Sequence, residues 1–234
     1  MARMSGKGKE RPGQAGFPLA GAPGKTDGLP RVGIFSGTFN PVHAGHIAFA
    51  LQTLEIAKLD KIYFLPERRP RDKKAVEHFA HRVAMLKRAL KPYNRLDVLE
   101  FDDVSFSVGR TLPKLQHLFP GAELVFLVGS DVVLSMARWP LIGRLFENAE
   151  LVIGMRHKQT VAAVKATIAA WQDPPPVTLI NSHAPEVSSS SVREALQTRK
   201  TTKGLLKSVA RYSNHHWLYV SFASGDENVD SPKA

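Results

Sequence analysis

Short apolar runs along this chain alternate with longer stretches in which apolar residues recur every three or four positions. Runs of four to eight apolar residues are typical of buried strands, and the longer spacing is typical of helices with one buried face. The pattern predicts strands at 31–36, 61–65, 96–101, 123–128, 150–155 and 177–180. It predicts helices at 44–58, 79–90, 110–118, 132–137, 140–146, 160–171, 190–197 and 205–212.

This alternation of strands and helices indicates βαβ units, and therefore an α/β domain whose doubly wound parallel sheet carries helices on both faces. We expect that single domain over residues 31–220. Residues 1–30 hold seven glycines and four prolines without any periodicity, and 221–234 are similar in character, so both are expected to be disordered tails. Ligands bind such sheets at the carboxyl ends of the strands, so functional residues should lie in the loops that follow them.

Composition narrows the classes of function. The chain of 234 residues has no cysteine, which excludes disulfides, cysteine-ligated metals and a thiolate nucleophile. No apolar run approaches the roughly 18 residues of a membrane span, and the N-terminus lacks the apolar core of a signal peptide. We therefore expect a cytoplasmic protein without a membrane partner. The net charge of +11 favours anionic partners such as nucleotides or nucleic acid.

The segment G-T-F-N-P-V-H-A-G-H, residues 37–46, follows the first strand and opens the first helix. Gly37 and Gly45 permit a tight turn and close approach of a ligand to the backbone. Free N–H groups and the dipole at a helix start favour an anion such as phosphate. His43 and His46 lie three positions apart and can both face that anion. The pair is also compatible with a structural role or a metal site, although no third ligand with suitable spacing is visible.

Four consecutive serines, residues 188–191, precede the helical pattern V-R-E-A-L. Serine is a strong N-cap residue, and the hydroxyl and N–H groups at a helix start can hold a polyphosphate. Arg193 follows about one turn later, where its guanidinium can form paired bonds to phosphate oxygens. A serine run by itself is also typical of a flexible linker.

Residues 37–46 resemble the signature of the nucleotidyltransferase superfamily that carries a T/H-x-G-H motif. Within it, G-T-F-N-P-x-H-x-G-H is most similar to nicotinate (or nicotinamide) mononucleotide adenylyltransferases. The serine segment resembles that family's I-S-S-T-x-I-R motif, with Ser188, Ser189, Ser190 and Arg193 at the matching positions. The resemblance runs from about residue 32 to 219 and implies a Rossmann-like nucleotidyltransferase fold.

The resemblance also implies roles for individual residues. His46 would contact the α-phosphate of ATP with His43 assisting, and the serine segment would bind the β- and γ-phosphates. The residues that it assigns to ATP are Gly37, Thr38, Phe39, Asn40, Gly45, Gly129, Asp131, Arg156, Ser188, Ser189, Ser190 and Arg193. The residues that it assigns to the mononucleotide are Thr111, Trp139 and Lys73.

Two segments depart from the family pattern, and both lie on the mononucleotide side. The loop P-E-R-R-P-R-D-K-K lacks the family's histidine, and F-S-V-G-R-T-L stands where relatives have S-Y-T-x-x-T-L. Taken singly, Asp131 is compatible with a helix N-cap and Trp139 with the core. Adenylyl transfer is therefore better supported than the identity of the acceptor.

The implied activity is transfer of the adenylyl group of ATP to nicotinate or nicotinamide mononucleotide, in NAD biosynthesis. The mononucleotide phosphate is already an anion, so in-line attack needs no general base, and Mg²⁺ is expected to bridge the ATP phosphates. The alternatives are a different phosphorylated acceptor, a nucleotide sensor without catalysis, and a nucleic-acid-binding protein. No helix-turn-helix, zinc knuckle or RNP-type segment is visible, so nucleic acid should bind weakly and nonspecifically through the basic tail. The sequence is compatible with a homo-oligomer.

Overall fold

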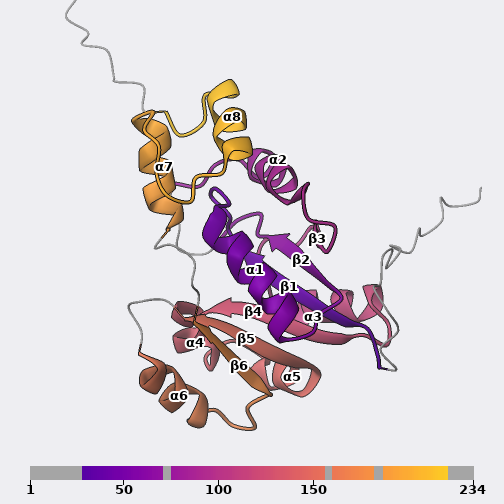
Figure 1. Cartoon of the computed structure of the whole chain (residues 1–234). Helices are drawn as coiled ribbons and strands as arrows, with labels where there is room; N and C mark the ends of the chain where they lie inside the picture. Colours follow the sequence, from indigo (N-terminus) through magenta and orange to yellow (C-terminus); the bar gives the residue numbers. More distant parts are fainter. Residues whose placement is uncertain (1–27, 71–74, 156–159, 182–186, 221–234) are drawn as a thin grey trace, which may run out of the picture.

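A parallel sheet with helices on both faces forms the body of the computed structural model, which describes residues 28–70, 75–155, 160–181 and 187–220 (Figure 1). The strands are β1 (Arg31–Gly37), β2 (Lys61–Pro66), β3 (Leu96–Val98), β4 (Glu123–Gly129), β5 (Ala149–Met155) and β6 (Val177–Asn181). The helices are α1 (Ala44–Ile56), α2 (Phe79–Leu90), α3 (Val108–Leu118), α4 (Ser130–Met136), α5 (Ile142–Asn148), α6 (Val161–Ala169), α7 (Ser189–Gln197) and α8 (Lys207–His215).

The strand order is β3-β2-β1-β4-β5-β6, and each neighbouring pair is parallel. The chain builds outward from β1 through β2 to β3, and then returns to place β4 on the other side of β1. The order of the strands therefore reverses between β1 and β4, and the connections that follow these two strands run to opposite faces of the sheet. Loops that leave adjacent strands toward opposite faces open a crevice there, which is where such sheets bind ligands.

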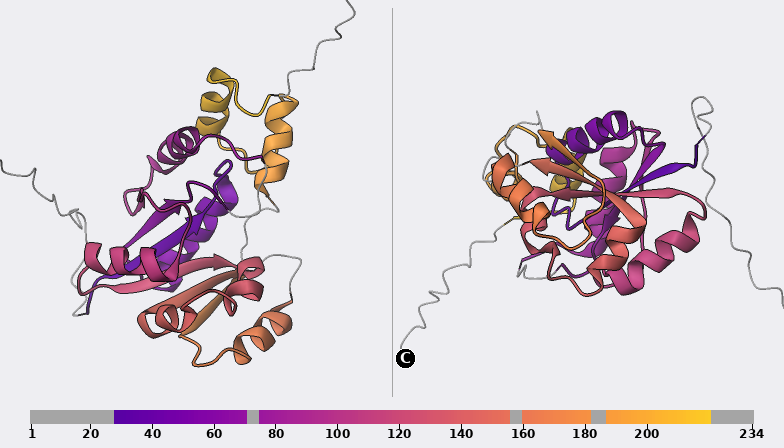
Figure 2. Two further views of the ribbon diagram at one scale, coloured as in Figure 1. Left: turned by 180° about the vertical axis from the view of Figure 1, so that it is seen from behind. Right: turned by 90° about the horizontal axis from the view of Figure 1, so that it is seen from below.

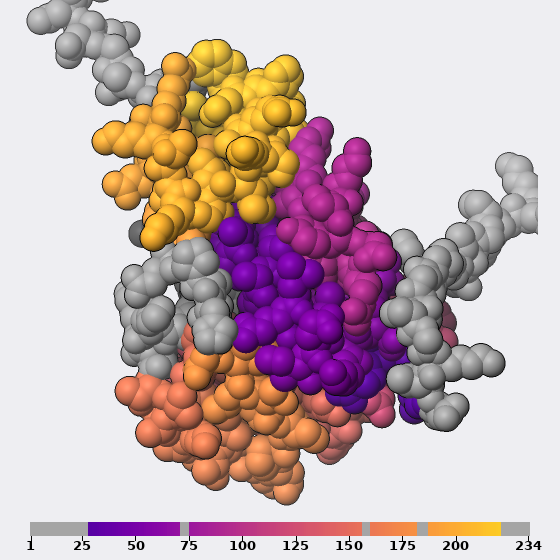
Figure 3. Space-filling model, in the orientation of Figure 1, coloured from indigo at the N-terminus to yellow at the C-terminus, as the bar shows by residue number. Residues whose placement is uncertain are grey.

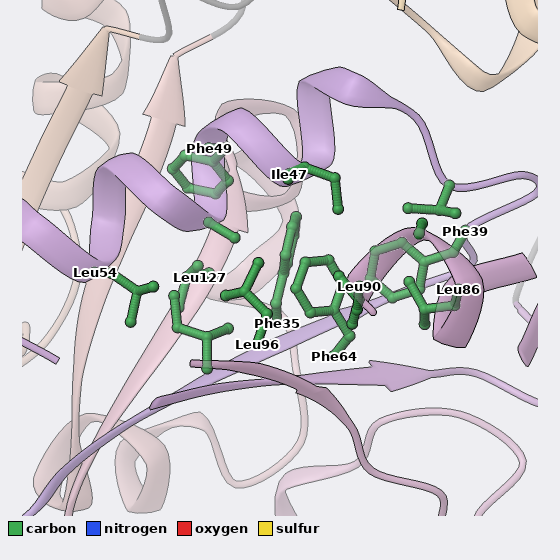
Figure 4. Packing of buried hydrophobic residues seen from close by; sticks show 14 of the residues in the cluster. Phe35, Phe39, Ile47, Phe49, Leu54, Phe64, Leu86, Leu90, Leu96 and Leu127 are labelled. Carbon is green, nitrogen blue, oxygen red and sulfur yellow. The ribbon is translucent and has the colours of Figure 1, made fainter. Parts of the chain in front are cut away.

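Two apolar layers hold the helices to the sheet. Successive strand residues point to opposite faces, so Ile34 belongs to one layer and Phe35 to the other. Helices α1, α2 and α8 cover the face of Phe35, and α3 to α6 cover the face of Ile34 (Figure 2). On the first face, Phe49 and Leu54 of α1 pack toward the sheet (Figure 4). The expected doubly wound fold is confirmed.

Helices α7 and α8 form a lobe next to α1 and α2, away from α5 and α6 (Figures 1 and 3). Val209 of α8 is fully buried in the layer that also holds α1 and α2. After α8 the backbone N–H of Leu218 bonds to Ser213 O, which turns the chain back toward the loop that follows β1. The lobe therefore brings the end of the described chain to the carboxyl edge of the sheet.

The predicted elements are all present, with shifted ends. The strand predicted at 96–101 was wrong beyond residue 98. The N–H of Leu99 still bonds to Phe64 O of β2, and after it the carbonyl of Phe101 accepts from Arg68 Nε. The expected tails lie outside the described residues, apart from 28–30, so their disorder stays a prediction. Among the described residues, no helix is both long and apolar enough to cross a membrane.

Candidate active site

A cavity of about 940 Å³ lies at the carboxyl ends of β1 and β4. Three segments that are distant in sequence contribute most of its lining: the loop between β1 and α1, the end of β4 with α4, and the start of α7. Both motifs singled out in the sequence therefore face one cavity. The fold brings them together because β1 and β4 are neighbours in the sheet and α7 lies over their carboxyl ends.

The two histidines of the first motif are stacked on each other at the start of α1. Their ring centroids are 3.7 Å apart, and the backbone N–H of His43 donates to Nδ1 of His46 over 3.2 Å. A ring nitrogen that accepts a hydrogen bond carries no proton, so the proton of neutral His46 lies on Nε2. Nε2 is therefore a donor, and both rings line the cavity.

Gly45 lies in the first turn of α1 beside His43, and its predicted contact with ATP stays a prediction. A Cβ at this position would lie 3.0 Å from Nδ1 of His43. Gly45 therefore leaves room for the His43 ring. Gly37 does line the cavity, and a Cβ there would approach the ring of Phe39 to 3.1 Å.

Phe39 has a left-handed backbone, with φ of 47°, which costs a non-glycine residue on the order of 1–2 kcal/mol. Its ring is held by Phe35 and Phe64, with centroids 5.4 and 5.3 Å away, and meets the edge of His46 at 5.1 Å. The packing of Phe39 in the core shown in Figure 4 thus offsets the strain, and the same ring contacts that of His46.

Asn40 joins three parts of the chain. Its Nδ2 donates to Ala75 O, and its Oδ1 accepts from the backbone N–H of Glu77 and from the hydroxyl of Tyr219, at 3.1 and 2.9 Å. Burial of Tyr219, with the charge of Glu77 nearby, raises the pKa of its hydroxyl well above the ordinary range. Asn40 lines the cavity, but its side chain is largely occupied with holding the loop.

The start of α7 is tied to the same loop. Arg193 donates from Nη1 to Asn40 O over 2.8 Å, although the two residues are 153 positions apart, and from Nη2 to Ser190 Oγ. Ser189 Oγ donates to Pro41 O, and Ser188 caps the helix by accepting from the N–H of Ser191. The serine run is therefore an ordered helix start, and Ser188, Ser189, Ser190 and Arg193 all line the cavity.

Residues at the end of β4 and along α4 form another wall. Gly129 and Asp131 line the cavity, and Asp131 lies in the first turn of α4, where the helix dipole favours a carboxylate. Trp139 follows α4 and is half-buried. Its ring centroid lies 6.0 Å from that of Phe106, so two aromatic rings from different segments meet at this end of the cavity.

Thr111 lies behind this wall, and its predicted contact with the mononucleotide stays a prediction. It is buried and is not among the residues that line the cavity. Its hydroxyl accepts from the backbone N–H of Ser107 and donates to Asp103 Oδ2, which organises the start of α3. The predicted contacts Lys73 and Arg156 lie outside the described residues.

Sequence reasoning missed several residues of the site. Phe106 and Arg138 line the cavity, and Glu67 both lines it and accepts the backbone N–H of Phe106 on Oε1 over 3.3 Å. Arg82 is fully buried and donates to the carbonyls of Thr38, Glu67, Arg68 and Glu77, and this burial lowers the pKa of its guanidinium. The position of Arg82 next to the apolar stripe of α2 was the sequence signal that this arginine could be buried.

The alternative of a metal site formed by the histidine pair finds no support in the described part of the chain. No group of three or more His, Cys, Asp or Glu residues there is arranged to hold a metal ion. The geometry instead suits an extended anion. N–H groups, hydroxyls, a histidine donor and a guanidinium surround one end of the cavity, and aromatic rings flank the other.

Comparison with known proteins gives a consistent result. Residues 34–195 match the family model described as cytidylyltransferase-like. The chain is 30% identical over 200 residues to the probable nicotinate-nucleotide adenylyltransferase of Neisseria gonorrhoeae, covering 82% of this chain and 99% of that protein. It is 29% identical over 199 residues to the nicotinate-nucleotide adenylyltransferase of Bacillus subtilis, covering 82% of this chain and all of that protein (100%).

Solved structures show the same fold. The nicotinic acid mononucleotide adenylyltransferase of Plasmodium falciparum, complexed with NaAD, superposes with a TM-score of 0.68 at 19% identity, over 81% of this chain and 97% of that one. The same protein complexed with APC gives a TM-score of 0.66 at 17% identity, over 81% and 97% of the two chains.

Proposed function

This chain is a nucleotidyltransferase that belongs to the cytidylyltransferase-like family and, within it, to the nicotinate-nucleotide adenylyltransferases, and we propose that it transfers the adenylyl group of ATP to nicotinate mononucleotide. A phosphate oxygen of the mononucleotide attacks the α-phosphorus, a new P–O bond forms, and the bond from the α-phosphorus to the bridging oxygen breaks. The products are the dinucleotide and pyrophosphate. The proposal rests above all on the two phosphate-type motifs facing one cavity.

His46 is the proposed electrostatic catalyst. Its Nδ1 is engaged by the His43 N–H, so neutral His46 presents its only ring proton on Nε2. A donor held rigidly at the place where charge develops stabilises the transition state without a reorganisation cost. His43 supports this donor through the stacked ring and the same hydrogen bond. The attacking phosphate is an anion, so no general base is required.

The leaving pyrophosphate is the proposed ligand of α7. Ser188, Ser189 and Ser190 offer N–H groups and hydroxyls at the helix start, and Arg193 adds a positive charge one turn later. Thr38 and Asn40 line the cavity from the loop between β1 and α1, opposite α7.

The aromatic end of the cavity is the proposed site of the pyridine ring. Trp139 and Phe106 flank this end, and Glu67 holds the backbone of Phe106. Lys73 on the mononucleotide and Arg156 on ATP remain proposals from the family resemblance. The enzyme would act in the cytoplasm, and weak nucleic-acid binding through residues 1–30 remains a prediction.

Mg²⁺ is the proposed companion of ATP. Magnesium in such sites keeps several waters and takes its other ligands from substrate phosphates, so a dedicated cage of carboxylates is not needed. When bound it would neutralise charge on the phosphates. Asp131 is the described carboxylate that lines the cavity at α4, and it is the residue that would meet the ion or its waters.

Pyrophosphate release tests the function. Wild-type protein with ATP and Mg²⁺ is given nicotinate mononucleotide, nicotinamide mononucleotide or no acceptor. Release should depend on a pyridine mononucleotide, and His46→Ala should lower kcat about 10²–10³-fold. His46→Asn keeps an acceptor for the His43 N–H but removes Nε2, so it should be equally impaired while remaining folded.

His117→Ala is the matched control, because His117 is exposed on α3 and does not line the cavity. Its turnover should equal that of wild type. Wild-type turnover in His46→Ala or His46→Asn would overturn the catalytic role of His46. Release that is independent of both mononucleotides would overturn the proposed acceptor.

A further inference from the structure

Arg138 is a charged residue of the cavity wall that the family signature does not include. It lies between α4 and Trp139 and lines the cavity together with Trp139 and Phe106. We propose that Arg138 determines specificity, because its guanidinium binds the ring carboxylate of nicotinate mononucleotide and so selects the acid over the neutral amide. This proposal rests on the function proposed above.

The backbone at Arg138 is held in place. Its N–H bonds to Ser135 O over 3.1 Å, and the N–H of Trp139 bonds to Met136 O over 2.9 Å. Ser135 Oγ donates to Val132 O in the same turn. Met136 is fully buried. Arg138 and Trp139 therefore extend from one rigid turn, and a ring that packs against Trp139 has the guanidinium of the preceding residue beside it.

A cation at this end of the cavity would offset the negative charge that faces a ring carboxylate. Glu67 lines the cavity and accepts the backbone N–H of Phe106, so its carboxylate would repel a ring carboxylate at this end. Arg193 lines it too, but its two terminal nitrogens donate to Asn40 O and Ser190 Oγ. The guanidinium of Arg138 makes no hydrogen bond or ion pair with any residue in the described ranges, so it can bind a ligand without giving up a protein partner.

A pyridine mononucleotide carries two groups that a guanidinium could bind, the ring carboxylate and the phosphate. The phosphate must reach the α-phosphorus of ATP beside His46, whereas Arg138 adjoins the aromatic pair. The carboxylate is therefore the group near Arg138. A planar guanidinium binds a carboxylate through two parallel hydrogen bonds, which a neutral carboxamide cannot match in charge or in acceptor number.

The test compares both acceptors at saturating ATP and Mg²⁺. Arg138→Gln should raise KM for nicotinate mononucleotide about 10–100-fold, the loss expected for a charge-assisted hydrogen bond, and should change KM for nicotinamide mononucleotide by less than about threefold. Arg138→Lys keeps the charge without the planar fork, so its KM should be intermediate. Arg144→Gln removes one charge from the exposed surface of α5 outside the cavity, and should leave both values unchanged.

The outcomes separate the two sources of negative charge. An equal rise in KM for both acceptors would mean that Arg138 binds the shared phosphate, and would overturn the proposal. Unchanged KM values in Arg138→Gln would overturn it as well.

Direct binding separates this proposal from the proposed function. Both mononucleotides are titrated calorimetrically into the full chain with an ATP analogue that cannot be cleaved. Wild type should bind the acid more tightly than the amide, and Arg138→Gln should lose that preference even if no turnover occurs with either acceptor. Equal binding of the two by wild type, or a preference retained in the variant, would refute the role of Arg138.

Discussion

The two ends of the cavity are built differently. The phosphate end comprises residues 37–46 and 188–193. Hydrogen bonds from Arg193, Ser189 and Tyr219 connect the loop after β1 to α7 and to the end of the described chain. The acceptor end, Phe106, Arg138 and Trp139, is positioned by the bond from the Phe106 N–H to Glu67 and by the last turn of α4.

The difference follows from what each end must recognise. Triphosphate is the same in every reaction with ATP, and backbone N–H groups at helix starts bind it wherever the backbone is held rigidly. One acceptor ring differs from another in shape and charge, and side chains recognise these differences through complementary packing and charge. We therefore expect substitutions at the phosphate end to cost turnover or stability, and substitutions at the acceptor end to change KM and preference.

The largest effect on stability should come from Arg82, which joins the two ends by donating to Thr38 O and Glu67 O. Arg82→Met leaves several buried carbonyls without donors and should lower the free energy of unfolding by about 3–4 kcal/mol. Urea unfolding measures the change. Arg88→Met, an exposed arginine on the same helix, should cost less than about 1 kcal/mol. Equal losses in the two variants would show that Arg82 does not join the ends.

A smaller and one-sided effect is expected at Glu67. Glu67→Ala removes the acceptor of the Phe106 N–H and should raise KM for the mononucleotide about 3–10-fold, with KM for ATP within about twofold. Glu67→Gln retains an acceptor oxygen and should be closer to wild type. Steady-state kinetics with each substrate varied separately would measure this. A matching rise in KM for ATP would show that the two ends are not independent.

The smallest effect concerns Tyr219 at the phosphate end. Tyr219→Phe removes the bond to Asn40 Oδ1 and should lower the free energy of unfolding by about 1 kcal/mol near pH 8. The pKa of Tyr219 is raised in the folded state, because the buried hydroxyl keeps its proton there, whereas the unfolded chain releases it above about pH 10. The protonated Tyr219 hydroxyl therefore makes its full contribution to the free energy of unfolding below about pH 10, and that free energy falls as the pH rises further.

Phenylalanine cannot ionise, so Tyr219→Phe should lose less stability than wild type between pH 8 and pH 11. Urea unfolding at the two pH values compares the proteins, and lysines and other tyrosines contribute equally to both. An identical loss in wild type and variant would contradict the assignment of this pH dependence to Tyr219.

Both expected motifs line the cavity. Each is a short segment that directly follows a strand or begins a helix, so its local sequence was enough to recognise it. The roles of single residues were less predictable. Gly45 accommodates the His43 ring, and Thr111 supports the start of α3 from behind the wall. A family motif identifies the positions in the chain that belong to the site, but it does not show which neighbouring groups each side chain contacts.

The sequence by itself determined the order of strands and helices and the two phosphate-type loops, because periodicity, caps and glycine spacing act over a few consecutive residues. Only the tertiary structure decided that Arg193 bonds to Asn40, that Glu67 holds Phe106, and that Arg138 lines the aromatic end. Those contacts join residues from different strands and helices, and their distances depend on how the whole sheet places its carboxyl ends. Local sequence patterns do not contain that information.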